Sequence, residues 1–205
     1  MAKGLVIGLT GGIASGKSTV SHMLSQAGLP IVDADQVAHM VEQPGGVALT
    51  RLVDQFSDSI LQDNGQLDRQ RLGQIVFNSK HALAKVNAIT QPLIRREIAR
   101  QTDQALQDDA KAVILDVPLL FEEGYDDHCD SVVVVKVKPA VQLKRLMKRN
   151  GLDRQQAQAR IDAQMSLEEK ARRADIVIDN NGDQQALRKA VNEFLKKLPG
   201  HWQLK

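Results

Sequence analysis

An apolar stretch at residues 5–10 leads directly into Gly11-Gly12-Ile13-Ala14-Ser15-Gly16-Lys17-Ser18, which satisfies the pattern G-x-x-x-x-G-K-[ST]. No other feature constrains the fold as much, because this motif needs a strand before it and a helix after it. Its glycines allow successive backbone N–H groups to turn inward, and the following helix adds a partially positive N-terminus. The sequence therefore predicts a strand–loop–helix unit that binds the phosphates of a nucleoside triphosphate.

Within this phosphate loop, Lys17 is expected to reach the β- and γ-phosphates, and the Ser18 hydroxyl is placed to ligate Mg²⁺. The residues expected to contact ATP are Gly12, Ile13, Ala14, Ser15, Gly16, Lys17, Ser18 and Thr19. The alternative is a glycine-rich turn with a solvated lysine. Neither the guanine-reading N-K-x-D sequence nor the L-S-G-G-Q transporter signature occurs in the chain, which favours phosphoryl transfer to a small acceptor.

Five short apolar runs predict a parallel sheet, because most of them are continuous rather than alternating, as in strands covered on both faces. The runs are residues 5–10, 30–33, 112–117, 132–137 and 176–178. Helical patterns separate them, so the predicted fold is α/β, a three-layer α/β/α sandwich. The 205 residues allow one such core with insertions.

Two helical insertions are predicted in this core. Residues 37–109 contain no clear strand and are too many for a simple crossover, so they are interpreted as an inserted helical subdomain. Residues 142–171 form a second helical insertion, expected to act as a lid. The core then comprises residues 1–36, 110–141 and 172–205, and we expect one compact unit with mobile helical flaps.

Three carboxylates are candidates for the chemistry near the phosphate loop. Asp33 follows the second predicted strand and should face the loop, since ligands of open α/β sheets bind beyond the carboxyl ends of the strands. A kinase that acts on an alcohol needs such a carboxylate to orient the hydroxyl and take its proton. Asp35 is the second candidate, or else a helix cap. Asp116 ends the third strand, where it would hold a Mg²⁺-bound water or anchor the loop that follows.

A basic segment follows the fourth predicted strand, and its mobile cations are expected to close over the phosphates. Arg145 and Arg149 are four residues apart and share a helix face, so at least one of them is expected to contact ATP. An ordinary solvated basic face is the alternative. The cations of this basic flap are Lys144, Arg145, Lys148, Arg149, Arg160, Lys170, Arg172 and Arg173.

Composition disfavours several classes of protein. A net charge of +2 does not indicate a nucleic-acid-binding protein, and no apolar run approaches the roughly 20 residues that span a bilayer. The single cysteine, Cys129, excludes an intramolecular disulfide, which favours a reducing, cytoplasmic location. Of the histidines, only His81 is considered for acceptor binding. Phe77 and Phe121 are interpreted as core residues rather than a stacking platform.

At this point the sequence resembles the dephospho-coenzyme A kinase family over nearly its whole length. The most specific segments are D-V-P-L-L-F-E at residues 116–122 and A-D-I-V-I-D-N at residues 174–180. The other matching segments are residues 7–19, 33–35, 63–69, 75–77, 142–146 and 160–161, together with Gln164.

The resemblance implies a P-loop nucleotide kinase fold with a five-stranded parallel sheet, a helical domain for the coenzyme A substrate and a lid. It implies that ATP, with Mg²⁺, phosphorylates the 3′-hydroxyl of dephospho-CoA to give CoA and ADP. In the family Asp33 is regarded as the catalytic base, and Asn180 and Asn181 lie near the adenine end of the ATP site. Another nucleotide or nucleoside kinase, or a nucleotide-binding module without turnover, is the alternative function.

Two positions depart from the family pattern. Ala14 stands where the family often has glycine, which is acceptable provided that the backbone torsion there is not strictly a glycine one. Gln91 precedes Pro92 where the family often has His-Pro, so an amide replaces a side chain that can carry a positive charge. The second departure concerns only the acceptor site.

Overall fold

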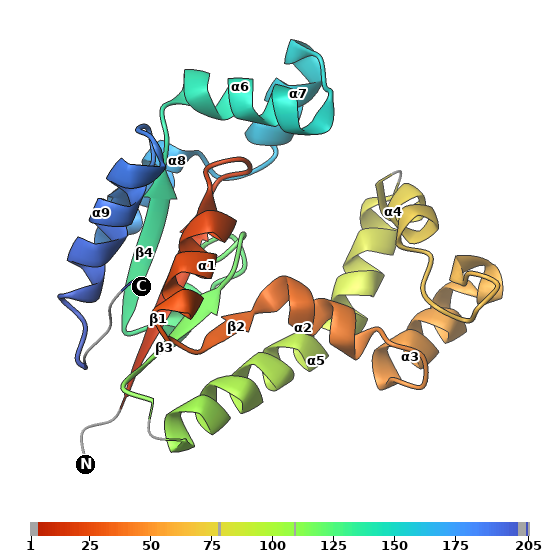
Figure 1. Ribbon diagram of the computed structural model, residues 1–205. Helices are drawn as coiled ribbons and strands as arrows, with labels where there is room; N and C mark the ends of the chain where they lie inside the picture. Colours follow the sequence, from red (N-terminus) through yellow and green to blue (C-terminus); the bar gives the residue numbers. More distant parts are fainter. Residues whose placement is uncertain (1–3, 78, 109, 201–203, 205) are drawn as a thin grey trace. The chain divides into compact units, whose positions relative to one another are not determined.

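The computed structural model describes residues 4–77, 79–108, 110–200 and 204 (Figure 1). The ends of the predicted core at residues 1–3 and 205, and the last residue of the predicted insertion, 109, lie outside this range. The elements in chain order are β1 (Leu5–Gly11), α1 (Lys17–Gln26), β2 (Ile31–Asp33), α2 (Ala34–Val41), α3 (Val47–Phe56), η1 (Asp58–Ile60), α4 (Arg69–Phe77), α5 (Lys80–Gln107), β3 (Ala112–Asp116), η2 (Asp126–His128), β4 (Ser131–Lys136), α6 (Pro139–Asn150), α7 (Arg154–Asp162), α8 (Leu167–Arg173), β5 (Ile176–Asp179) and α9 (Gln184–Leu195).

The five predicted strands form one parallel sheet in the order β2-β3-β1-β4-β5, which confirms the predicted fold class. Each strand begins and ends within one residue of the predicted limits. β1 lies at the centre because it pairs with both β3 and β4. The loop after β1 therefore emerges from the middle of the sheet, between the carboxyl ends of its neighbours.

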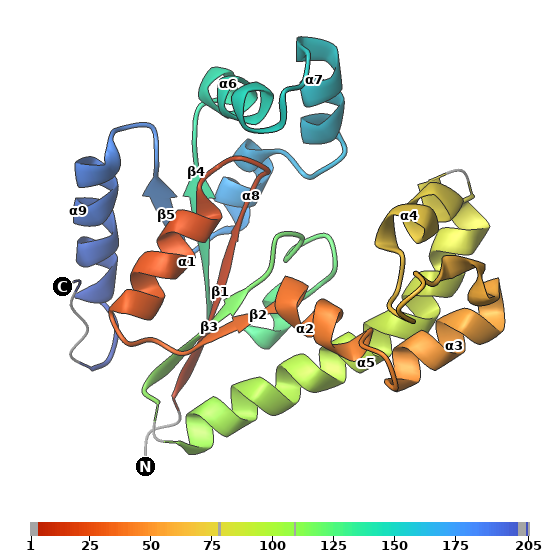
Figure 2. The same cartoon turned by 45° about the vertical axis from the view of Figure 1, so that its right-hand side comes forward.

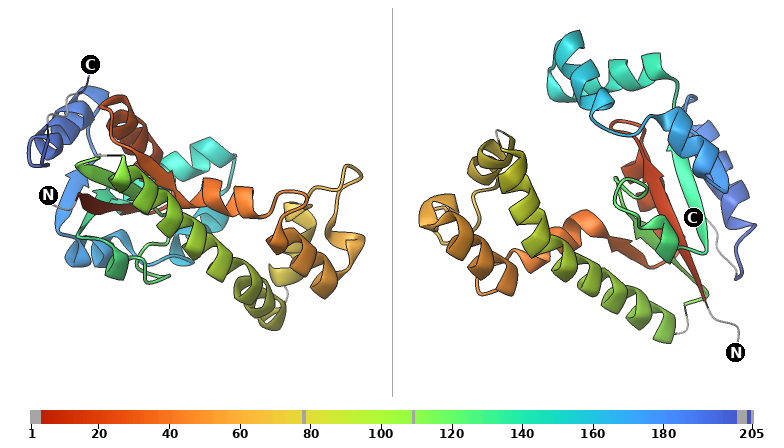
Figure 3. Two further views of the ribbon diagram at one scale, coloured as in Figure 1. Left: turned by 90° about the horizontal axis from the view of Figure 1, so that it is seen from below. Right: turned by 180° about the vertical axis from the view of Figure 1, so that it is seen from behind.

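Helices cover both faces of this sheet, as Figures 1 and 3 show. α1 and α9 pack on one face, where Leu24, Val191 and Phe194 join Leu9 and Val133 in one buried cluster. α8 packs against β4 on the opposite face. These contacts make the three layers that the continuous apolar strands predicted, since each strand needs apolar cover on both sides.

The paired helices α6 and α7 lie beyond the ends of β1 and β4 (Figure 2). α6 begins with Pro139 at its first turn, and α7 begins with a capping box between Asp153 and Gln156, as their spacing predicted. Leu146 and Ala157 are buried between the two helices, and Ile13 of the phosphate loop packs against the same cluster. The loop tip therefore has apolar contact with the predicted lid.

The chain divides into two compact units, one of Met1–Asp33 with Thr102–Lys205 and the other of Ala34–Gln101. The second unit differs slightly from the predicted insertion, 37–109, because α5 continues through the division. In the same division the predicted lid, 142–171, belongs to the unit that contains the sheet. The functional roles assigned to these segments remain predictions.

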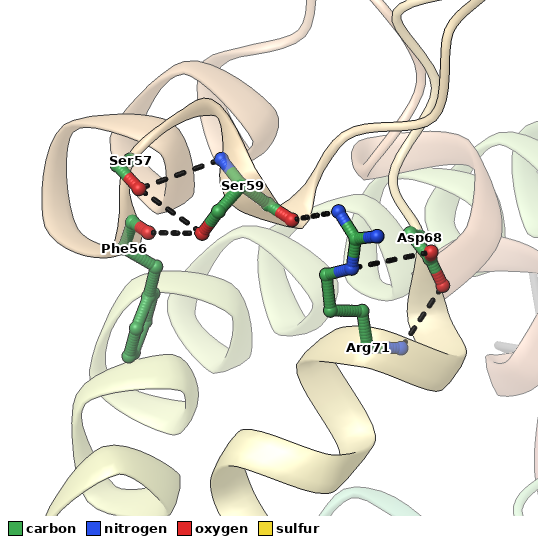
Figure 4. A network of polar contacts seen from close by, with 5 residues as sticks. All are labelled: Phe56, Ser57, Ser59, Asp68 and Arg71. Atoms are coloured by element: carbon green, nitrogen blue, oxygen red, sulfur yellow. Dashed lines mark hydrogen bonds and ion pairs between the residues drawn. The ribbon is translucent and has the colours of Figure 1, made fainter.

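The second unit has its own buried cluster, which includes Leu49, Leu52, Ile60 and Leu72. A network of polar contacts holds the connection before α4 (Figure 4). Its main elements are Asp68, which accepts the Arg71 backbone N–H at 2.9 Å, and the Arg71 guanidinium, which donates to the Ser59 carbonyl at 2.7 Å. Phe56 and Ser57 complete the network through Ser59: the Ser59 hydroxyl donates to the Phe56 carbonyl at 3.2 Å.

Two interpretations of apolar residues have opposite outcomes. Phe121 is buried, as expected. Phe77, however, is 90% exposed at the end of α4, so its assignment to the core is wrong. Phe77 is the last residue of α4, and at this position no described neighbour covers its ring. Within the described part of the chain, no helix has the length and apolarity needed to cross a membrane.

Candidate active site

The phosphate loop joins β1 to α1 through two residues with left-handed backbone torsions, Ala14 at φ 59° and Gly16 at φ 93°. The Ser15 N–H donates to the Gly12 carbonyl at 3.0 Å, which closes the turn. The torsion at Ala14 is one that glycine adopts more easily than alanine, so the substitution at this position has a conformational cost. Alanine is therefore tolerated at position 14, but in a left-handed torsion that glycine adopts at a lower cost.

Asn180, which follows β5, supports the loop through a hydrogen bond to its backbone. Its Nδ2 donates to the Ser15 carbonyl at 2.7 Å, and the residue is only 7% exposed. A Cβ on residue 16 would collide with the same Nδ2 atom, so Gly16 is required both by its torsion and by this close approach. Asn180 thus acts on the loop backbone in this structure.

Two glutamines of the predicted lid hold one residue at the tip of the loop. Gln142 Nε2 donates to the Ile13 carbonyl at 2.9 Å, and Gln164 Oε1 accepts the Ile13 N–H at 2.9 Å. A Cβ at Gly12 would lie 2.6 Å from Gln142 Nε2, so the glutamine fits closely against a glycine. The Ile13 N–H, predicted to contact ATP, is here directed to Gln164.

Lys17, Asp33 and Asp116 come together where three neighbouring strands end. Asp116 is the register partner of Asp33 on β2 and of Leu9 on β1. The Lys17 ammonium forms an ion pair with the Asp116 carboxylate. Burial raises the pKa of Asp116, while Lys17 and Ser21 lower it and the Asp33 charge raises it. The strand order therefore brings Asp33, Asp116 and Lys17 to the same edge of the sheet, as predicted from the strand ends.

The oxygen atoms at this edge fit a magnesium ion bound partly by phosphates. Ser18 is exposed in the first turn of α1, and Asp116 supplies a carboxylate. Mg²⁺ is a hard ion that commonly keeps several waters and takes only one or two protein oxygens beside the substrate phosphates. Among the described residues, no group of three or more acidic, histidine or cysteine side chains is arranged so that it could hold a metal ion, and this donor set does not need one.

The predicted ATP contacts outside the loop have different surroundings. Arg145 Nη2 donates to the Asn180 carbonyl at 3.1 Å, so this arginine lies beside the residue that supports the loop. Arg149 is exposed near the end of α6 and donates to the Asn150 side chain at 2.9 Å. Asn181 Oδ1 accepts the Lys138 N–H at 2.7 Å. Of the two arginines, Arg145 is the one that contacts a residue supporting the loop, and the contact of either arginine with ATP remains a prediction.

The remaining predicted substrate residues lie in the second compact unit. Asp35 is exposed in the first turn of α2, two residues after Asp33 ends β2. His81 is exposed in the first turn of α5. Their assignment to acceptor binding remains a prediction.

Sequence reasoning missed a buried polar connection beside the site. Lys170, which was assigned to the mobile basic flap, has no exposed surface. Its ammonium donates to the Pro118 carbonyl at 2.8 Å and pairs with Glu122 at 3.0 Å. The assignment was wrong because α8 packs against β4, which carries Lys170 into the interior while Arg172 on the same helix stays exposed. Lysine in a basic helix gives no sequence signal of burial.

A central strand that enters a glycine-rich phosphate loop, a lysine in that loop and two carboxylates at the next strand ends together define a P-loop kinase. A family model described as dephospho-CoA kinase matches residues 5–186. The chain belongs to the dephospho-CoA kinase family, and it is accordingly a phosphotransferase of a family that uses ATP as phosphate donor.

Individual relatives agree with this assignment. The dephospho-CoA kinase of Geobacillus kaustophilus is 48% identical over 193 residues, which cover 94% of this chain and 96% of that protein. The crystal structure of TT1252 from Thermus thermophilus is similar with a TM-score of 0.81 and 33% identity, covering 97% of this chain and 100% of that one. The dephospho-CoA kinase from Campylobacter jejuni has a TM-score of 0.73 and 30% identity, covering 94% and 96%.

Proposed function

We propose that this kinase transfers the γ-phosphoryl group of ATP to the 3′-hydroxyl of dephospho-CoA and releases CoA and ADP. The observation that carries the mechanism is the register of Asp33 with Asp116 at the strand ends, beside the loop lysine. Asp116 of this pair is engaged with Lys17, and Asp33 is the carboxylate that we assign to the acceptor.

In this proposal Asp33 accepts a hydrogen bond from the 3′-hydroxyl, orients its oxygen toward the γ-phosphorus and takes its proton during transfer. Lys17 exchanges part of its contact with Asp116 for the β- and γ-phosphates. Loop N–H groups within residues 12–19 bind the phosphate oxygens and fix their position, while the Ile13 N–H stays with Gln164 and supports the loop. Positioning and charge stabilisation account for most of the catalysis in such reactions.

Magnesium would be held by Ser18 and, through water, by Asp116, and it would neutralise charge on the bridged phosphates. Arg145 would close on the phosphates together with α6 and α7, and Arg149 would contribute from the same helix face. Closure of this lid excludes water, which would otherwise hydrolyse ATP. Asn180 and Asn181 would border the adenine end of the ATP site.

The inserted helical segment, residues 37–109, is proposed to bind the coenzyme A part of the acceptor, with His81 in it and Asp35 just before it as candidate contacts. Gln91 can offer an amide there but no positive charge. We expect the enzyme to work in the reducing cytoplasm, because its one cysteine, Cys129, cannot form an intramolecular disulfide.

A coupled ADP-release assay with ATP, Mg²⁺ and dephospho-CoA tests this function, with AMP and adenosine as parallel acceptors. ADP release that requires dephospho-CoA, with a product that carries a new 3′-phosphate, is the expected result. Faster turnover of AMP or adenosine would instead favour another nucleotide or nucleoside kinase. ATP binding without stimulation by any acceptor would favour a nucleotide-binding module.

A further inference from the structure

Lys170 is a fully buried charge that the proposed mechanism does not use. Its side chain has no exposed surface, and lysine is almost never found so deeply buried unless it is paired. Two oxygens receive its ammonium: the Pro118 carbonyl at 2.8 Å and Glu122 Oε1 at 3.0 Å. Both acceptors belong to the segment that follows Asp116 at the end of β3.

These two acceptors connect Lys170 to the rest of the site. The Pro118 carbonyl also accepts the hydroxyl of Thr10, a buried residue of β1 just before the phosphate loop, at 2.9 Å. Glu122 Oε1 also accepts the Met165 N–H at 3.0 Å, at the start of the turn before α8. One ammonium therefore ties α8 to the 116–122 segment, and through Pro118 to the strand that carries the loop.

Stability alone does not explain a lysine at this position. The desolvation of a buried ion pair offsets much of its attraction, so apolar residues of similar volume are often as stabilising or more so. Burial lowers the pKa of Lys170, Glu122 raises it, and the nearby Lys17 charge lowers it further.

We propose that Lys170 is a positioning residue for phosphoryl transfer. Its ammonium, anchored by Glu122 and the Pro118 carbonyl, fixes the segment after Asp116 against β1. Asp116 and Lys17 then hold one geometry when ATP and Mg²⁺ bind. This inference rests on the proposed function, because its main readout is phosphoryl transfer.

The test variant is Lys170→Met combined with Glu122→Gln, which removes both charges together and leaves no unpaired buried ion. Lys170→Arg keeps the charge, and Lys136→Met is the matched control, since Lys136 is partly exposed and its contact with Glu168 of α8 is long, at 3.9 Å. We expect kcat of the double variant to fall about 10- to 100-fold, as for small misplacements of reacting groups. We expect the Kd of Mg·ATP to rise severalfold, while KM for dephospho-CoA stays within about twofold.

The melting temperature of the nucleotide-free double variant should stay close to that of the wild type, whereas its increase on adding Mg·ATP should shrink. Lys170→Arg should recover part of kcat, and Lys136→Met should behave as the wild type. A kcat within twofold of the wild type, or an equal loss in Lys136→Met, would overturn the proposal. A lower melting temperature with an unchanged Mg·ATP effect would also overturn it, because that result describes a purely structural residue.

If the double variant does not fold, the single variant Glu122→Gln tests the inference. It keeps the charge of Lys170 but weakens its anchor, so kcat should fall by a smaller factor than in the double variant. An unchanged kcat would refute the inference. Wild-type enzyme is assayed in parallel. Absence of acceptor-dependent turnover in the wild type would contradict the proposed function instead, and the Mg·ATP affinities of the variants would still decide the role of Lys170.

Discussion

Gly16→Ala should damage the phosphate loop through two separable effects. At φ 93° the backbone of residue 16 is in a region that L-residues avoid, at a cost of about 1 kcal/mol. The new Cβ would also collide with Asn180 Nδ2 and displace it from the Ser15 carbonyl, to which it donates at 2.7 Å. Leaving a buried carbonyl without its donor costs roughly 1–3 kcal/mol.

The two costs together come to about 3 kcal/mol of unfolding free energy. At about 2–4 °C per kcal/mol for a chain of this size, the melting temperature should fall by about 6–12 °C. Gly151→Ala is the matched control, because φ at Gly151 is 63° and a Cβ there meets no atom within 4 Å. That variant has only the torsional cost, so we expect a decrease of about 2–4 °C.

Thermal unfolding followed by circular dichroism measures both variants, and a double-mutant cycle with Asn180→Ala separates the two effects. Asn180→Ala has already lost the bond to Ser15, so adding Gly16→Ala should cost only the torsional part, and the cycle should show coupling of about 2 kcal/mol. If Gly16→Ala is no worse than Gly151→Ala, or if the two changes add, the role given to Asn180 is refuted.

Three further predictions concern the loop and the single thiol. Ala14→Gly should raise the unfolding free energy by about 0.5–1 kcal/mol, because relief of the left-handed torsion exceeds the added chain entropy, and a lower melting temperature would contradict the strain. Gln142→Ala and Gln164→Ala should each raise the Kd of Mg·ATP and should couple in a double-mutant cycle by about 0.5–1 kcal/mol, since both hold Ile13; strict additivity would disprove a joint role. Burial, with Asp126 and Asp130, raises the pKa of Cys129 to about 12, so iodoacetamide should react with it at pH 8 far more slowly than after unfolding in urea, and equal rates would refute this.

The nucleotide core was predictable because its signals are local and strong. The continuous apolar runs gave strand limits to within one residue, and the spacing of the loop motif placed Lys17 and Ser18 at the start of a helix. The meeting of Asp33 with Asp116 followed from a general rule, that the carboxyl ends of parallel strands share one edge. Polar residues at the ends of buried strands are therefore the best sequence signal for this site.

The supporting residues were not predictable in the same way. Polar residues of the kind usually exposed on helices make the supporting contacts: Gln142, Gln164 and Lys170. They reach the loop and the 116–122 segment only because the chain around α6 and α8 packs there. Gln142 and Gln164 did stand within segments of the family resemblance, which was the one available signal. The prediction for Phe77 was wrong in the opposite sense, because a residue predicted to be buried is exposed. An apolar residue at a helix end need not have a neighbour that covers it.

The account depends most directly on Asp33 as the group that orients and deprotonates the acceptor. The decisive measurement is kcat of Asp33→Asn with dephospho-CoA, together with the Kd of Mg·ATP for the same protein and with Asp127→Asn, an exposed carboxylate of η2, as the control. We expect kcat of Asp33→Asn to fall by about 10² or more while the Kd of Mg·ATP stays within a few-fold of the wild type. Unchanged turnover in Asp33→Asn would remove Asp33 from the mechanism and contradict the account.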